Sequence, residues 1–339
     1  SLGKLPGSYY VFRQLISMML GLGFFFACSK FGESFYRRYQ RSLIMFSLIA
    51  SGAVLAISGV ANRWIQIGGF SFQPVELIKF TVIIVASIFL ADRMNANEER
   101  DFKKTLYPVG LWLALTGFIV VVLQRDLGSM VVIIGIIFTM LLLSGTPLNK
   151  LIIAGLAIAA IIAIAIASTP YRRDRFMTFL QPERDCSSEG YHACQALIAV
   201  GSGGLMGLGL GNSVQAYGYL PEASNDSIFA IYAEKFGFMG SLILVIIYGT
   251  LLYRILLVVK RAGDIFSRLV AGGVFAWFAV QAFINIGAMV GLLPLKGITL
   301  PFVSYGGTSL VFVLAGLGVV YRASSYTVIR RSVNSPRGV

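Results

Sequence analysis

The chain has 339 residues, of which 57% are hydrophobic and 13% are charged, whereas soluble domains average about 45–50% apolar and about 25% charged residues. This composition excludes an ordinary soluble enzyme. Apolar stretches of about 20 residues recur along the sequence, and a stretch of that length can cross a bilayer as a helix. The sequence therefore predicts an all-α fold, a polytopic transmembrane helix bundle.

The hydropathy predicts nine spans, at residues 11–31, 42–62, 75–91, 106–124, 127–146, 150–169, 228–259, 269–293 and 307–323. Of the 28 lysines and arginines, 17 fall in the loops of one side and nine in those of the other, while Lys79 and Lys235 lie in spans. Cytoplasmic loops carry the excess of basic residues, so the first side, with the C-terminus, is cytoplasmic. Since nine spans is an odd number, Ser1 then lies outside the cell. The chain nevertheless shows no signal peptide and starts with Ser rather than Met. We therefore expect one further span upstream, which makes ten.

One connection, residues 170–226, is much longer than the others and lies outside in this topology. Loops of more than about 15 residues in compact domains are usually functional or disordered. A helix is expected from Tyr191 to Val200, followed by a glycine-rich run at 201–211. A second outer segment at 294–307 contains prolines and glycines, and irregular backbone at membrane depth lines wet cavities or is buried in protein. We expect a single membrane domain, 1–339, whose large outer loop 170–226 carries the catalytic region.

Asp226 ends the long loop immediately before a span. Two roles are open for it. It caps the helix that we expect to begin at Ser227, or it acts as a general base on a hydroxyl group at the membrane mouth. The positive end of the helix favours the ionised carboxylate. Glu234, further along the same helix, is assigned a structural role.

Arg172, Arg173 and Arg175 form a basic cluster on the outer side, against the trend of the other charges. A solvated flank of the preceding span is one reading. The planar guanidinium also makes paired, charge-assisted hydrogen bonds to phosphate, and this favours phosphate binding.

Ionisable residues inside spans are costly, at about 2.5–3.5 kcal/mol each, and call for a reason. Glu76 and Lys79 share one helical face just after Gln73 and can pair. The pair either locks helix packing or lines a polar substrate cavity. Asp126, in a break between two spans, is expected in a hydrated turn or as a helix cap.

The remaining motifs have ordinary readings. The glycine-rich run lacks the GxxxxGK[ST] pattern of a nucleotide loop, so it serves as a hinge or close-packing element, or its amides hold an anion. Cys186 and Cys194 lie in the oxidising exterior, which permits a disulfide that spacing alone does not establish. His192 reads as a polar loop residue. The sequence contains no CxxC or HxxxH spacing, so it gives no indication of a zinc site.

Six motifs occur in a fixed order along the chain. They are RWIQIGGFSFQPVELIKF (63–80), QRDLGSM (124–130), FLQPERD (179–185), QALIAVGSGGLMGLGLG (195–211), YLPEASNDSIFAIYAEKFGFMG (219–240) and INIGAMVGLLPLKGITLPFVSYGGTS (284–309). On these motifs, residues 9–326 resemble the SEDS proteins (shape, elongation, division and sporulation), the FtsW/RodA group of bacterial cell-wall polymerases. One departure is Arg125, where the family usually has proline.

The resemblance implies a peptidoglycan glycosyltransferase that polymerises lipid II at the outer face of the bacterial cytoplasmic membrane. Asp226 occupies the position of the family's catalytic aspartate. It would take the proton from the GlcNAc 4-hydroxyl group, whose oxygen attacks the anomeric carbon with inversion and releases undecaprenyl pyrophosphate. Glu76 and Lys79 match the family's paired residues beneath the cavity, and we also assign Gln73, Ser304 and the arginine cluster to substrate binding.

The stretch YLPEA, followed by an aspartate and IFA, resembles division members (FtsW) more than elongation members (RodA). The implied partners are a class B penicillin-binding protein, which supplies the transpeptidase, other divisome proteins and membrane lipids, with no nucleic acid. A divalent cation, Mg²⁺ or Mn²⁺, is left open as a cofactor. Two other functions are open: a lipid II flippase, and a scaffold without catalytic activity that recruits a transpeptidase.

Overall fold

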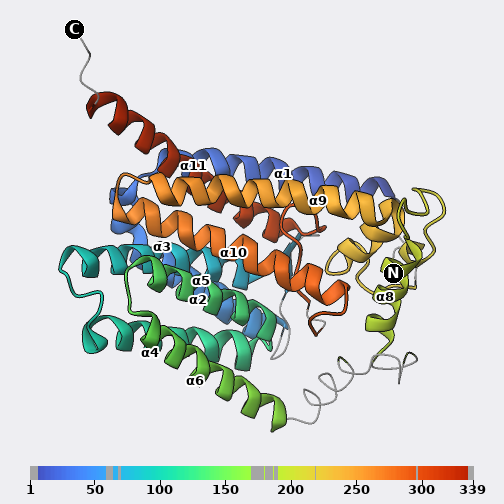
Figure 1. Cartoon of the computed structure of the whole chain (residues 1–339), viewed down its shortest axis with the longest axis horizontal. Coiled ribbons are helices and arrows are strands. Elements are labelled where there is room, and N and C mark those ends of the chain that lie inside the picture. Colours follow the sequence, from blue (N-terminus) through green and yellow to red (C-terminus); the bar gives the residue numbers. More distant parts are fainter. Residues whose placement is uncertain are drawn as a thin grey trace. The chain divides into compact units, whose positions relative to one another are not determined.

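The computed structural model describes residues 7–58, 64–67, 70–168, 179, 186, 190–217, 219–294 and 297–334. Within these ranges the chain is mainly helical (Figure 1). The elements are α1 (Gly7–Lys30), α2 (Glu33–Ser58), β1 (Ile65–Ile67), β2 (Phe70–Phe72), α3 (Pro74–Asn95), η1 (Phe102–Leu106), α4 (Tyr107–Gly117), η2 (Phe118–Leu123), α5 (Leu127–Leu143), α6 (Leu148–Ala167), α8 (Tyr191–Ser202), η4 (Gln215–Tyr217), α9 (Ile228–Arg261), α10 (Ile265–Met289) and α11 (Gly307–Asn334).

Each predicted span contains an apolar helix. In the described part of the chain, seven helices are long and apolar enough to cross a membrane, and two more, Leu127–Leu143 and Leu148–Ile161, are apolar but shorter. The polytopic, helical character is thus confirmed, while the count of nine spans stays a prediction. The helix expected from Tyr191 to Val200 is present as α8.

Two local features differ from the expectation. The helix α2 begins at Glu33, well before residue 42, and an ion pair between Glu33 and Arg37 (2.6 Å) joins side chains one turn apart. An antiparallel hairpin, β1–β2, pairs Ile65 with Phe72 and Ile67 with Phe70. Its sequence signal is IQI and FSF, alternating apolar and polar residues on either side of two glycines, which is typical of a tight hairpin.

The chain divides into two compact units. Unit 1 comprises Ser1–Val11, Asn149–Leu251 and Val280–Tyr305, and unit 2 comprises Phe12–Leu148, Leu252–Ala279 and Gly306–Val339. In unit 2, α3 packs against α2, α5 and α11, and most of its residues are buried, polar ones included. A helix that is buried all round can hold charged groups only if they are paired.

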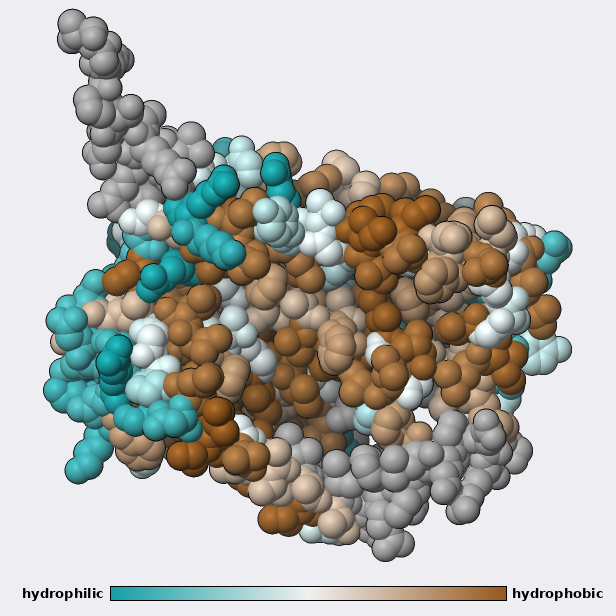
Figure 2. Space-filling model, viewed as in Figure 1, coloured by the Kyte–Doolittle hydropathy of each residue, from teal (hydrophilic) through white to brown (hydrophobic). Residues whose placement is uncertain are grey.

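Large apolar side chains remain exposed on the outer faces of the helices. On α6, for example, Ile153, Leu156, Ile161 and Ile164 are each about two-thirds exposed. Figure 2 shows apolar side chains over much of the visible face, with hydrophilic side chains gathered where α3 leads into η1, at the left of the view. Apolar patches of this extent on a folded chain mark contact with lipid or with other proteins.

Candidate functional site

The predicted site residues lie in both units. Asp226 and Ser304 belong to unit 1, and Gln73, Glu76 and Lys79 belong to unit 2. Arg172, Arg173 and Arg175 fall outside the described residues. We therefore build the site as two separate groups, beginning with the turn that carries Asp226.

In unit 1, the turn before α9 is held by its backbone carbonyl groups. The carbonyl oxygen of Ser224 accepts the Tyr305 amide (2.8 Å), that of Asn225 accepts the Ser304 hydroxyl (2.7 Å), and that of Asp226 accepts Asn285 Nδ2 (2.7 Å). Three consecutive carbonyl groups are thus tied to residues about 60 to 80 positions away in the sequence. Because the backbone is held, the half-buried Asp226 side chain starts from a constrained Cα position.

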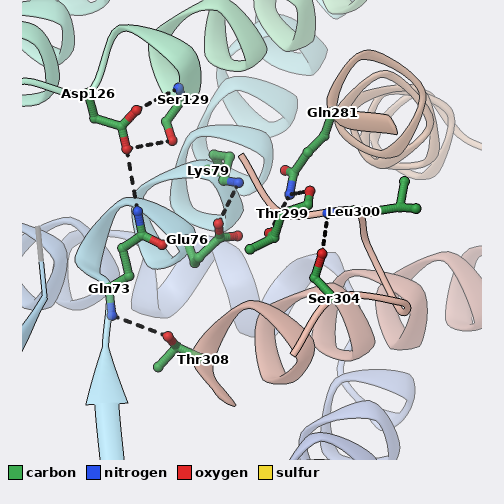
Figure 3. Close-up of polar contacts among 10 residues, drawn as sticks. All are labelled: Gln73, Glu76, Lys79, Asp126, Ser129, Gln281, Thr299, Leu300, Ser304 and Thr308. Carbon is green, nitrogen blue, oxygen red and sulfur yellow. Dashed lines mark hydrogen bonds and ion pairs between the residues drawn. The ribbon is translucent and has the colours of Figure 1, made fainter. Parts of the chain in front are cut away.

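The residues that hold this turn lie in α10 and in the connection after it. Further hydrogen bonds hold these residues in turn. Asn285 Nδ2 also donates to the Ile298 carbonyl (2.7 Å), and Ser304 Oγ accepts the Leu300 amide (2.7 Å). One turn earlier on α10, Gln281 Nε2 donates to both oxygens of Thr299 (Figure 3). The Ser304 hydroxyl therefore positions the Asp226 turn, a role that the sequence did not predict, and its contact with substrate stays a prediction.

Asn285 is a functional candidate that sequence reasoning missed. It is buried inside a predicted span, at 1% exposure. A polar residue at membrane depth is a signal for function or for specific pairing, so the signal was present. Its partners could not be read from the sequence, because nothing in the spacing links residue 285 to the Asp226 turn.

The helix after this turn begins at Ile228, one residue later than expected. Ser227 rather than Asp226 therefore precedes the first helical residue, where an N-cap lies. Ser227 Oγ donates to the Pro221 carbonyl (2.9 Å) and is 2.7 Å from His192 Nε2 of α8. His192, read from the sequence as an ordinary polar loop residue, thus contacts the residue next to Asp226.

Glu234 has the structural role expected of it. Its buried carboxylate accepts hydrogen bonds from the Ser213 hydroxyl, from the Val214 amide (2.9 Å) and from the Gln215 amide (3.1 Å). A buried carboxylate is stable only with such partners. The contacts fix the residues that follow the glycine-rich run to α9.

The glycine-rich run packs directly on a kink in α9. Gly237, inside the helix, has φ +66°, so backbone groups around it lose their helical partners. The run replaces them: the Leu208 amide donates to the Glu234 carbonyl (2.9 Å), and the Phe238 amide donates to the Gly204 carbonyl (2.8 Å). This arrangement supports the close-packing reading of the run, since irregular backbone in a membrane protein must be satisfied by protein.

In unit 2, the expected ion pair is formed. Lys79 Nζ lies 2.8 Å from Glu76 Oε1, with both side chains buried (Figure 3). The same nitrogen is 5.1 Å from the centre of the Trp277 ring. The second carboxylate oxygen of Glu76 is buried and has no hydrogen-bond partner among the described residues. An oxygen in that state is costly unless a further polar group reaches it. The unpaired Glu76 oxygen does not discriminate between locking helix packing and lining a substrate cavity, so both roles of the pair stay open.

Asp126 is a helix cap, one of the two readings open for it. Its carboxylate accepts the Ser129 amide (3.0 Å) and hydroxyl (2.9 Å) at the start of α5, and also Gln73 Nε2 (3.4 Å). The backbone amide of Gln73 donates to Thr308 Oγ1 of α11 (3.2 Å). Gln73, predicted to bind substrate, thus links three segments of unit 2, and its substrate contact stays a prediction.

The residue before Asp126, Arg125, has a left-handed backbone conformation. Arg125 is exposed and has φ +52°. Proline is restricted to φ near −65°. The turn formed here is therefore one that a proline could not make.

Cys186 and Cys194 form a disulfide, with their Cα atoms 5.6 Å apart. The sequence left this pairing open, and the structure resolves it. The third cysteine, Cys28, is free and buried in α1. The bond ties residue 186 to the first turn of α8, the turn that carries His192.

Within the described ranges, no three histidine, cysteine, aspartate or glutamate side chains come together as a metal site. The divalent cation considered from the resemblance therefore stays a prediction, and no step below depends on it.

Comparison with known proteins covers nearly the whole chain. The model of the FtsW/RodA/SpoVE family, described as cell cycle proteins, matches residues 4–329. The probable peptidoglycan glycosyltransferase FtsW of Nitrosococcus halophilus is 36% identical over 340 residues, which is 96% of this chain and 86% of the relative. Stage V sporulation protein E of Bacillus subtilis is 33% identical over 324 residues, covering 94% and 88%.

Solved structures are also similar to this chain over most of its length. A chain of a peptidoglycan synthase complex, in which polymerization and crosslinking are coordinated, has a TM-score of 0.78 and 27% identity, covering 96% of this chain and 92% of that one. The rod shape determining protein RodA of Thermus thermophilus has a TM-score of 0.65 and 25% identity, covering 94% and 89%.

Proposed function

This chain belongs to the FtsW/RodA/SpoVE family of cell cycle proteins, and from that premise we propose that it is a peptidoglycan glycosyltransferase with Asp226 as its general base. The observation that carries the proposal is the fixation of the Asp226 turn, in which three consecutive carbonyl groups are held by Asn285, Ser304 and Tyr305. A general base must stay within hydrogen-bond reach of the proton it removes. A turn immobilised at its backbone supplies that condition.

The proposed reaction is a direct displacement between two lipid II-derived molecules. The Asp226 carboxylate takes the proton of the GlcNAc 4-hydroxyl group on the incoming lipid II. The oxygen forms a bond to the anomeric carbon of the chain held on the second lipid, and the bond from that carbon to the pyrophosphate oxygen breaks. Undecaprenyl pyrophosphate leaves with the electron pair, the configuration inverts, and no covalent sugar–enzyme intermediate forms.

The leaving pyrophosphate gains negative charge, which positioned cations stabilise. We assign this role to Arg172, Arg173 and Arg175, whose planar guanidinium groups match phosphate oxygens. We also assign Gln73, Glu76 and Lys79 to substrate binding in this proposal. Ser304 contributes through the Asp226 turn.

We further propose nine spans in this chain, an outer catalytic face and a cytoplasmic C-terminus, because basic residues concentrate on the other side of the predicted topology. A division role, as in the FtsW relatives, fits the YLPEA motif. A class B penicillin-binding protein is the partner we expect, since one structural relative is part of a complex that couples polymerization to crosslinking. Other divisome proteins would join it.

The test uses the full chain with a transpeptidase-inactive partner, supplied with labelled lipid II in detergent or liposomes. Asp226→Ala and Asp226→Asn should both abolish glycan polymerisation, because neither side chain can accept the proton. Polymerisation undiminished in either variant would refute the base assignment. Parallel reactions with and without a chelator decide whether a divalent cation takes part.

The flippase function is supported by one observation, the buried Glu76–Lys79 pair, because ionisable groups inside spans often mark transport pathways. Liposomes loaded with lipid II on one leaflet distinguish the two functions. Movement of lipid II by the Asp226→Ala variant, with no polymerisation by the wild type, would favour transport. A wild-type complex inert in both assays would favour the scaffold role.

A further inference from the structure

The sole histidine of the chain, His192, lies beside the proposed general base in a way that the reaction above does not use. It belongs to the first turn of α8, two residues before the disulfide-bonded Cys194. Its Nε2 atom is 2.7 Å from Ser227 Oγ. Ser227 follows Asp226 directly and is fully buried.

The direction of this hydrogen bond follows from the Ser227 hydroxyl group. A serine hydroxyl has one hydrogen to donate, and Ser227 gives it to the Pro221 carbonyl at 2.9 Å. Ser227 Oγ is therefore the acceptor toward His192, and the imidazole carries its hydrogen on Nε2. Both the neutral Nε2–H tautomer and the imidazolium ion can make this bond.

We infer that His192 is a positioning residue for Asp226, which acts through Ser227; this inference rests on the proposed function. The carbonyl groups of residues 224, 225 and 226 are held by Tyr305, Ser304 and Asn285. These contacts come from α10 and from the connection that follows it. His192 adds a contact from α8, in the large outer loop, and completes the support at the C-terminal end of the turn.

The His192–Ser227 hydrogen bond therefore links the outer loop to the residue that follows the general base. A hydrogen bond to a buried hydroxyl group fixes the first residue after Asp226, where a shift of the backbone would rotate the carboxylate away from its substrate. Misplacement by about 1 Å can cost large factors in rate. His192 exerts its effect on turnover, not on lipid II binding.

A double-mutant cycle tests the inference, using the full chain with its transpeptidase-inactive partner and labelled lipid II. His192→Ala should lower kcat roughly 3- to 10-fold, the effect of one lost hydrogen bond, with KM nearly unchanged. In the Ser227→Ala background the same change should have almost no further effect, because the acceptor is already absent. Additive losses in the double variant would overturn the inference.

His192→Gln supplies a second readout. The glutamine amide keeps a donor at a similar reach and has no titratable group, so kcat should recover toward the wild type. Its pH–rate profile should match the wild type between pH 5.5 and 8, the range about the ordinary imidazole pKa of about 6.5. A profile that loses a limb near pH 6.5 would show that the histidine acts through its charge, and would contradict a positioning role.

Tyr191→Phe, a change of one hydroxyl group in the same turn of α8, is the matched control and should keep wild-type kinetics. The Asp226→Ala variant separates this inference from the proposed function. If that variant polymerises lipid II, the base assignment itself fails. If it is inactive while His192→Ala equals the wild type in kcat, only the role of His192 fails.

Discussion

Asn285 donates both hydrogens of one amide group to backbone carbonyl groups, that of Asp226 at 2.7 Å and that of Ile298 at 2.7 Å. A single buried side chain on α10 thereby joins the turn of the proposed general base to the connection that precedes α11. The site is consequently sensitive to α10, although α10 offers no acid or base of its own to this contact.

Asn285→Ala and the isosteric Asn285→Asp should each lower polymerisation at least tenfold per folded molecule. Both remove the donor, and each buried carbonyl left without a partner costs about 1–3 kcal/mol. Gln281→Ala is the control, because Gln281 lies one turn away on α10 and holds Thr299 rather than the Asp226 turn. The control should lose stability but retain more activity. Normal turnover by Asn285→Asp would contradict the positioning role.

Gly203→Ala and Gly207→Ala should prevent correct folding. A Cβ atom at Gly203 would lie 2.1 Å from the Ala233 carbonyl oxygen, and one at Gly207 would lie 2.2 Å from that of Lys235, with φ +81° as a further strain. Gly201→Ala, in the same run but with open space around the added atom, should be tolerated. Size-exclusion chromatography and thermal unfolding in detergent measure the difference. Equal behaviour of the three variants would refute the packing account.

Lys79→Met and Glu76→Gln should each destabilise the protein by about 3–5 kcal/mol, because each leaves a buried charge unpaired. The double variant should regain much of the lost stability, since a neutral pair of similar volume needs no partner charge. We expect polymerisation to stay low in the double variant, as the substrate-lining role requires. Full activity in a stable double variant would show that the pair serves helix packing alone.

Cys186 and Cys194 should resist alkylation until a reductant is added. In denatured, unreduced protein one cysteine, Cys28, should react, and reduction should expose the other two. Replacing either bridged residue by serine should lower stability by about 2–3 kcal/mol, the value expected for a short loop. Intact mass spectrometry reads the first result and thermal unfolding reads the second. Three reactive cysteines before reduction would refute the bond.

Arg172→Ala and Arg175→Ala should raise the KM for lipid II about tenfold without changing the unfolding temperature. The proposed contact is to the pyrophosphate group, and a charge-assisted hydrogen bond contributes about 1.5–3 kcal/mol. Arg125→Ala, which changes an exposed arginine on the same predicted side, controls for a general loss of positive charge. Initial rates over a range of lipid II concentrations measure KM. A KM that stays at the wild-type value would remove these arginines from the site.

The sequence by itself determined the class of fold and the residue most suited to the chemistry. Apolar length placed a helix in each of the nine predicted spans, because the bilayer requires about 20 residues per crossing whatever the partners are. The family motifs placed Asp226 at the position of the catalytic aspartate. The ionisable groups inside a predicted span singled out Glu76 and Lys79. Their spacing of three residues already put both on one helical face, since helical periodicity is a local property.

Only the tertiary structure decided what holds Asp226 in place. Asn285, Ser304 and His192 reach the turn from other elements, and hydrogen-bond partners far apart in sequence leave no periodic signal. The same reason applies to the pairing of Cys186 with Cys194 and to the glycine run, whose small residues are explained by backbone atoms of α9 at Ala233 and Lys235. Local patterns are set by the chain's own geometry, whereas these contacts depend on how α8, α9 and α10 pack within unit 1.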